Sequence, residues 1–150
     1  KRDLPKYISN YANKDIQVFN VTDIVEFNNI DTLTHAPYGQ YIFNEIKEDK
    51  VSDPELEQMK INTKSQATNY LNKIMTKNDF DIFISVDNSM AGIAAAAHFP
   101  ALTIPMGYRS DGQPSNITFI AKSKNEQLLY NIAYRCENQS KRRVAPKKYN

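Results

Sequence analysis

The chain has 150 residues, a formal net charge of +2 and 41% apolar residues, enough for one ordinary hydrophobic core. This composition predicts one domain over residues 1–150. The small net charge argues against a nucleic-acid partner, and no run of about 18 apolar residues predicts a membrane span. A single cysteine excludes a disulfide framework within the chain and is typical of a reducing compartment, so we expect a cytoplasmic location.

The first third of the chain predicts short helices joined by turns. Residues 4–11 place apolar side chains at helical spacing. Thr22 is expected to cap a second helix that ends near Asn28-Asn29. The turn at residues 37–40, PYGQ, should precede a further helix.

A long amphipathic helix is predicted after residue 52. Asp53-Pro54 is a strong helix start, and no glycine or proline follows until after Lys77. We expect the helix to pack on a sheet, with Met59 and Met75 filling the core. The predicted apolar stripe consists of Leu56, Met59, Ala67, Tyr70, Leu71 and Ile74.

Residues 82–121 predict a small sheet. Ile82–Val86 is a short apolar run typical of a strand buried on both faces, and an alanine-rich helix follows it. Further strands are expected at 101–104 and 116–121, joined by a turn that contains Asp111-Gly112. The fold class is therefore α/β, a three-layer α/β/α piece with a small mixed sheet flanked by helices. Two buried strands out of three indicate an incomplete sheet, with an exposed edge open to self-association.

The C-terminal region predicts one more helix and a basic end. Ser123 and Glu126 form the pattern of a capping box, and the following helix should bury Leu129, Ile132, Ala133 and Cys136. The basic end, residues 141–148, is typical of a solvated tail. The alternative, nucleic-acid binding, would need more basic clusters with interleaved aromatic residues.

Six short segments occur in an order that is more specific than any one of them. They are TDIVEFN (22–28), PYGQ (37–40), HFPALTIPMG (98–107), DGQP (111–114), ITFI (117–120) and NEQLL (125–129). In this order they resemble the C-terminal portion of the amidase signature family, and more closely its peptide-amidase and cyclic-amide-hydrolase branch. The resemblance covers essentially the whole chain, and it implies the C-terminal part of the amidase signature fold.

The resemblance also implies a chemistry that this chain does not carry alone. The family hydrolyses amides with a serine nucleophile, a second serine in a cis peptide, a lysine base and a glycine-rich oxyanion hole. The four glycines here, at 39, 92, 107 and 112, include no adjacent pair, and no nucleophile site is visible.

The implied role is to complete the sheet and form one pocket wall of a parent amidase that acts on linear or cyclic amides through an acyl-enzyme. Alone the chain should be inactive. Its expected partners are the N-terminal catalytic portion of the same protein and a small amide substrate, without a cofactor. The alternative is a stand-alone small-molecule or protein binding module without catalysis.

Four residues are candidates for substrate binding. Asp87, Asn88 and Ser89 directly follow a predicted buried strand, where ligand crevices form in open α/β sheets. The resemblance places this loop beside the substrate pocket, although relatives often carry proline and threonine there. A helix cap made by Asn88 or Ser89 is the alternative. Met106 is a candidate for the pocket wall, and its alternative role is plain core filling.

No catalytic residue and no metal site are predicted. His35 and His98 are the two histidines, and neither has a second ligand at metal-binding spacing. His98 stands where the family usually has glycine, so we expect a turn role for it. His35 is expected in a loop. Cys136 is expected to act as a small buried hydrophobic residue.

Overall fold

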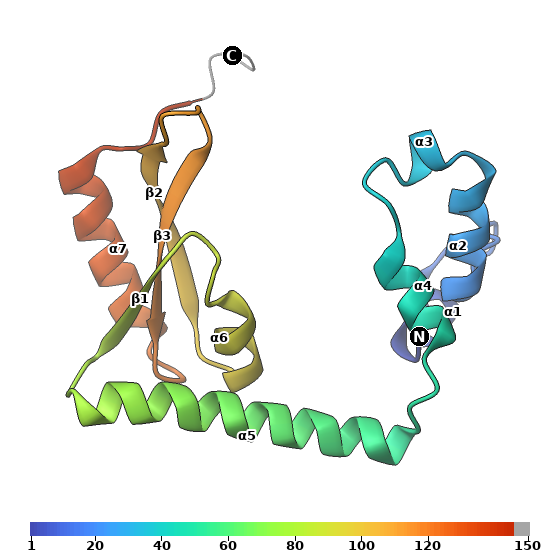
Figure 1. Cartoon of the computed structure of the whole chain (residues 1–150), viewed down its shortest axis with the longest axis horizontal. Helices are drawn as coiled ribbons and strands as arrows, with labels where there is room; N and C mark the ends of the chain where they lie inside the picture. Colours follow the sequence, from blue (N-terminus) through green and yellow to red (C-terminus); the bar gives the residue numbers. More distant parts are fainter. Residues whose placement is uncertain (146–150) are drawn as a thin grey trace. The chain divides into compact units, whose positions relative to one another are not determined.

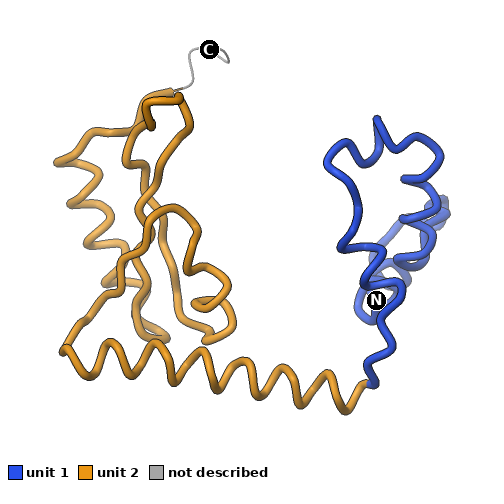
Figure 2. Tube along the Cα trace, in the orientation of Figure 1, with its two compact units in different colours: residues 1–52 blue, residues 53–150 orange. Residues whose placement is uncertain are grey.

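The computed structural model describes residues 1–145. These belong to two compact units, Lys1–Ser52 and Asp53–Asn150, which Figure 2 shows in different colours. Each unit has its own helices and its own buried residues. Within residues 1–145, no helix combines the length and the apolar character needed to cross a bilayer. The expectation of one domain over residues 1–150 stays a prediction.

The first unit is built from helices. They are α1 (Asp3–Tyr11), α2 (Val21–Ile30), α3 (Thr32–His35) and α4 (Tyr41–Glu48). The predicted helices are confirmed, but the predicted cap of α2 is wrong. Asn20, not Thr22, is the capping residue: its side chain accepts bonds from the N–H groups of Thr22 and Asp23, at 2.7 and 3.3 Å. The Asp23 carboxylate accepts the Asn20 N–H in return, at 3.0 Å, which completes a capping box.

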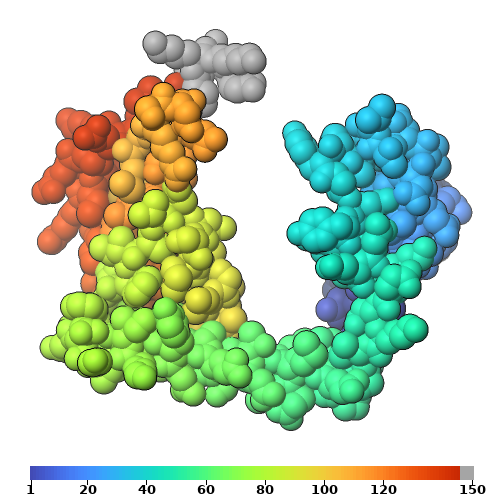
Figure 3. Space-filling model, viewed as in Figure 1, coloured from blue at the N-terminus to red at the C-terminus, as the bar shows by residue number. Residues whose placement is uncertain are grey.

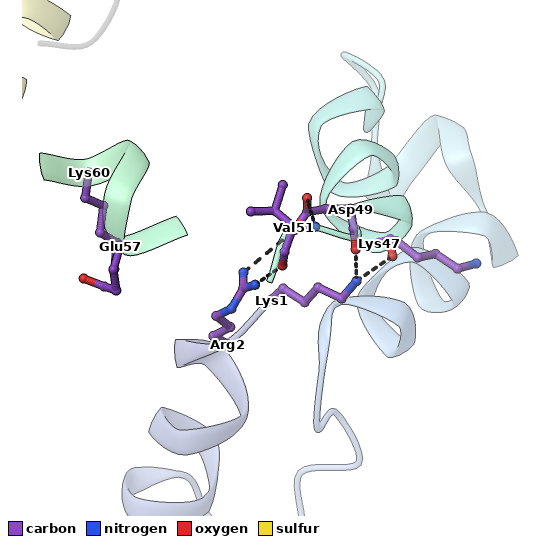
Figure 4. A network of polar contacts seen from close by, with 7 residues as sticks. All are labelled: Lys1, Arg2, Lys47, Asp49, Val51, Glu57 and Lys60. Carbon is purple, nitrogen blue, oxygen red and sulfur yellow. Dashed lines mark hydrogen bonds and ion pairs between the residues drawn. The ribbon is translucent and has the colours of Figure 1, made fainter. Parts of the chain in front are cut away.

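Polar contacts connect the two ends of the first unit, which has few buried residues. Among its residues, Val21, Val25 and Asn28 are buried. Lys1 donates a hydrogen bond to the carbonyl oxygen of Lys47, at 3.1 Å, and Arg2 donates one to the carbonyl oxygen of Val51 (Figure 4). These bonds connect the start of α1 to the last turn of α4 and to the segment that follows it.

The prediction that His35 lies in a loop is wrong. It lies in the short helix α3 and not in a loop. Its ring stacks on Phe27 with the two centroids 4.2 Å apart, and its Nδ1 lies 3.0 Å from the Phe27 carbonyl oxygen. The stacking and the hydrogen bond give His35 a structural role in joining α3 to α2.

The second unit is a three-layer arrangement (Figure 1). Its elements are α5 (Asp53–Lys77), β1 (Ile82–Val86), α6 (Ala91–Ala97), β2 (Ala101–Tyr108), β3 (Pro114–Ala121) and α7 (Glu126–Ser140). One core cluster joins α5 and α6 to Ile120 of β3. The other joins Phe119 and Ala121 of β3 to Leu129 of α7. Helices therefore cover both faces of the sheet, which confirms the predicted fold class.

The strand order is β1-β3-β2, and both neighbouring pairs are antiparallel. β1 and β2 point in the same direction, as a strand-helix-strand unit requires, but β3 lies between them. The sheet of this chain is thus antiparallel at every pairing, where the sequence predicted a mixed one. The cause is the tight turn after β2: Gly112, at φ 84°, donates its N–H to the Arg109 carbonyl oxygen and turns β3 straight back along β2.

Two further predictions, the burial of β1 on both faces and the core position of Met59, are wrong. Ile84 and Val86 are 56% and 57% exposed, so β1 is not buried on both faces within this chain, because α7 packs mainly on β2 and β3. In α5, Leu71 and Met75 are fully buried, whereas Met59 is 54% exposed. Figure 3 shows that the first turns of α5 (green) extend past the other elements of their own unit in this view. The core role is confirmed for Met75 and wrong for Met59.

The last helix packs on the sheet through the face that its sequence predicted. Leu129 and Ala133 of α7 are buried, and Ile132 and Cys136 pack half-buried against the same cluster. The predicted capping box is wrong, because α7 begins after Asn125 and no side chain caps it. Of the predicted basic end, residues 146–148 lie outside the described residues.

Candidate functional site

Asp87 fastens the end of β1 to the start of β3. Its backbone N–H donates to the Asn116 carbonyl oxygen, at 2.8 Å, and its carboxylate accepts the Asn116 N–H, at 2.8 Å. The same carboxylate accepts a bond from the Ser115 hydroxyl, at 3.3 Å, and forms an ion pair with Arg109 from the turn after β2. With φ at 51°, Asp87 adopts the left-handed conformation that asparagine and aspartate tolerate best after glycine. Both carboxylate oxygens of this predicted site residue are therefore engaged by the protein itself.

These contacts keep the Asp87 side chain ionised. The N–H bond from Asn116 is the largest cause that lowers the pKa of Asp87 below its ordinary value. The Arg109 charge and the Ser115 hydroxyl lower this pKa further, and partial desolvation opposes them. A carboxylate with a lowered pKa and satisfied oxygens is a poor general base, so the geometry favours a positioning role for Asp87.

The two residues after Asp87 are exposed at the same end of the sheet. The Ser89 hydroxyl donates to the Val86 carbonyl oxygen, at 3.0 Å. The first turn of α6 is preceded by Met90 and receives no side-chain cap, so the helix-cap alternative for Asn88 and Ser89 is wrong. Among the described residues, the Asn88 amide has no protein hydrogen-bond partner. Asn88 is thus the polar group of this loop that is available to a ligand.

Met106 lies at an irregularity in β2. The register between β2 and β3 shifts between Pro105 and Gly107, and Met106 occupies the extra position. Met106 is 44% exposed and lines a cavity of about 430 Å³, so plain core filling does not describe it. Pro105 pairs with Asn116, the residue that binds Asp87. The four predicted residues therefore lie at one end of the sheet, although the loop at 87–89 does not line this cavity.

A row of hydroxyl groups crosses the sheet beside this loop, and the sequence analysis missed it. Ser85, Thr118 and Thr103 are direct neighbours on β1, β3 and β2. The Thr118 hydroxyl lies 2.8 Å from that of Thr103 and donates to the Asp87 carbonyl oxygen. The Ser85 hydroxyl is buried without a partner among the described residues. Only the strand register aligns these three residues. Their positions in the sequence do not predict that their hydroxyl groups are neighbours.

Replacing Thr118 with valine should lower the free energy of unfolding by about 0.5–1.5 kcal/mol, because the half-buried Asp87 carbonyl oxygen loses its hydrogen-bond donor. Thr103→Val is the matched control. It breaks the same hydroxyl pair, but Thr103 is exposed, so water replaces the lost bond and the cost should be smaller. Urea unfolding of both variants measures the difference. Equal losses would show that the bond to Asp87 contributes nothing of its own.

The remaining candidate residues have structural roles. His98 ends α6 at φ 57° and donates its N–H to the Ala95 carbonyl oxygen, at 3.1 Å, which confirms the predicted turn role. This left-handed position explains why a glycine suits it equally well. Within residues 1–145, no three side chains of His, Cys, Asp or Glu are grouped closely enough to hold a metal ion.

Known proteins share this arrangement of elements. The chain superposes on an amidase family protein from Bacillus anthracis with a TM-score of 0.84 and 29% identity, over 98% of this chain and 29% of that one. The chain therefore resembles the C-terminal portion of an amidase family protein. The likeness confirms the recognition made from the sequence, the C-terminal portion of an amidase signature hydrolase. No protein-family model matches the chain.

Two further likenesses agree with this assignment. The native peptide amidase of Stenotrophomonas maltophilia matches with a TM-score of 0.78 and 20% identity, over 98% of this chain and 32% of that one. An Arabidopsis thaliana protein named a probable amidase is 27% identical over 84 residues, which is 56% of this chain and 16% of that protein. The chain therefore spans less than a third of the length of these relatives.

Proposed function

We propose that this chain is the C-terminal part of an amidase and supplies a sheet and one wall of the substrate pocket in an enzyme that hydrolyses linear or cyclic amides. The observation that carries the proposal is the superposition on the Bacillus anthracis amidase family protein over 98% of this chain. The proposed location is cytoplasmic, in line with the single cysteine.

In the proposed mechanism the reacting groups come from outside this chain. A serine of the catalytic portion attacks the amide carbonyl, the amine leaves after it takes up a proton, and water hydrolyses the resulting acyl-enzyme. No two of the four glycines here are adjacent, so this chain offers no glycine-rich oxyanion hole. We therefore expect the chain alone to be inactive.

The unpaired edge of β1 supports the proposal that a further strand pairs with it. β1 has β3 on one side, and within the described residues no strand pairs with its other side. Its outer N–H and C=O groups are open to pairing, and exposed Ile84 and Val86 add apolar surface. In the proposal, a strand of the catalytic portion of the same protein covers this edge. A second copy of the chain is the competing occupant.

We propose Asn88, Ser89 and Met106 as the residues that contact the amide substrate. Asn88 has an amide available for hydrogen bonding, and Met106 offers an exposed apolar side chain at the same end of the sheet. Asp87, the fourth predicted residue, contributes by holding the loop in place through Asn116 and Arg109.

Co-production with the polypeptide encoded directly upstream tests the proposal. Each piece alone should leave a peptide amide and a cyclic amide intact, and the two together should hydrolyse at least one of them. Ile84→Lys should weaken the assembly, because it places a charge on the edge that the partner covers. Lys122→Glu, on an exposed residue after β3, is the control. Hydrolysis by the chain alone, or none from a stable complex, would contradict the proposal.

The second candidate function is a binding module without catalysis. The observation in its favour is the cavity beside Met106, which this chain forms by itself. A monomeric chain that binds no upstream polypeptide and still binds a ligand would favour this alternative.

A further inference from the structure

The cavity between the sheet and α7 has the size and lining of a small-molecule site. Its volume of about 430 Å³ falls in the range of about 300–1,000 Å³ that is typical of such sites. Its walls come from three elements of one unit, β2, β3 and α7. The lining residues are Ile104, Pro105, Met106, Ile117, Phe119, Cys136, Ser140 and Arg142. Six of these side chains carry no nitrogen or oxygen atom, so polar groups are confined to the end formed by Ser140 and Arg142.

The fold holds the Arg142 side chain at this cavity. Lys141, at φ 46°, reverses the chain after α7 and directs it back toward β2. The Arg142 Cδ lies 4.0 Å from the position that a Cβ on Gly107 would occupy. Two residues later, the Val144 carbonyl oxygen accepts a hydrogen bond from the Tyr108 hydroxyl, at 3.1 Å. Arg142 is therefore placed against the irregular end of β2 by contacts on both sides of it.

The charge of Arg142 is available to a ligand. Within residues 1–145, its guanidinium forms no ion pair with a carboxylate. A guanidinium prefers planar, two-oxygen partners, to which it donates two parallel hydrogen bonds. An apolar cavity with one such group at its rim is complementary to a molecule with an alkyl body and a carboxylate head.

We propose that this cavity binds a small amphiphilic carboxylate, with its alkyl part against Met106 and Phe119 and its carboxylate on Arg142. The proposal shares Met106 with the amide contacts proposed above, but its test measures occupancy of the cavity and not amide hydrolysis. It therefore stands or falls separately from the proposed enzymatic function.

Cys136 provides a reporter for occupancy of the cavity, since it is the single cysteine of the chain and lies in the cavity wall. Monobromobimane would label its thiol, and the labelling rate would be followed by fluorescence while decanoate is titrated below its micelle concentration. We expect decanoate to slow the labelling at least threefold. Decanol, which lacks the charge, should protect only at higher concentration.

Two variants test the assigned contacts. Arg142→Gln should raise the decanoate concentration that gives half protection about tenfold and leave protection by decanol unchanged. Arg135→Gln is the matched control, because it removes an arginine from the exposed face of α7, outside the cavity lining, and should change nothing. Met106→Trp should fill the cavity and abolish protection, with circular dichroism used to verify folding.

Three outcomes would overturn the proposal. The first is a labelling rate that decanoate does not change. The second is an equal loss of protection in Arg142→Gln and Arg135→Gln, which would indicate general attraction to positive charge. The third is protection by decanol and decanoate at the same concentration in the unmodified chain, which would show that Arg142 does not bind the carboxylate.

Discussion

Leu71→Ala is expected to lower the free energy of unfolding of the second unit by about 2–5 kcal/mol. Leu71 of α5 is fully buried in a cluster with Met75, Phe99 and Ile120. Alanine removes most of the apolar side chain and leaves a cavity that the surrounding helix and strand cannot fill. Because this cluster is what joins α5 to the sheet, the loss is the largest that we expect from one substitution.

Urea unfolding followed by circular dichroism measures this effect. Ile61→Ala is the matched control on the same helix, because Ile61 is 61% exposed and its loss should change stability by less than about 0.5 kcal/mol. Similar losses for the two variants would mean that the first half of α5 is buried as deeply as the second half, and would contradict the packing described here.

Asp87→Asn should destabilise the chain at neutral pH and have little effect in acid. The asparagine oxygen can still accept the Asn116 N–H, but the ion pair with Arg109 is lost. Since contacts in the folded state lower the pKa of Asp87, its ionised form stabilises the fold. This contribution is fully present above about pH 4, the ordinary value for aspartate, and is lost as the pH falls through the lower folded-state pKa.

The measurement is the difference in urea midpoint between the unmodified chain and Asp87→Asn from pH 7 to pH 2.5. The difference should shrink toward zero at the acid end. Asp81→Asn, at an exposed aspartate just before β1, is the control and should give a small difference. A difference for Asp87→Asn that stays constant across this range would show that the ionised carboxylate contributes no stability.

The sequence predicted where the loop at 87–89 lies but not the contacts that it makes. The run Ile82–Val86 followed by Asp87-Asn88-Ser89 correctly placed a loop at the end of a strand. It did not show that Arg109, Ser115 and Asn116 would bind both oxygens of the Asp87 carboxylate. Those partners lie 22 to 29 positions away along the chain, and only the pairing of β1 with β3 brings them together.

The sequence alone determined the helices and strands apart from the short helix α3, because helical spacing, turn residues and apolar runs act over a few neighbouring positions. It also determined the amidase likeness, through six segments in a fixed order. Tertiary structure decided that β3 lies between β1 and β2, that β1 is an exposed edge, and that Arg142 returns to β2. These features depend on which distant segments pair and pack, and that choice is made by burial over the whole unit rather than by local pattern.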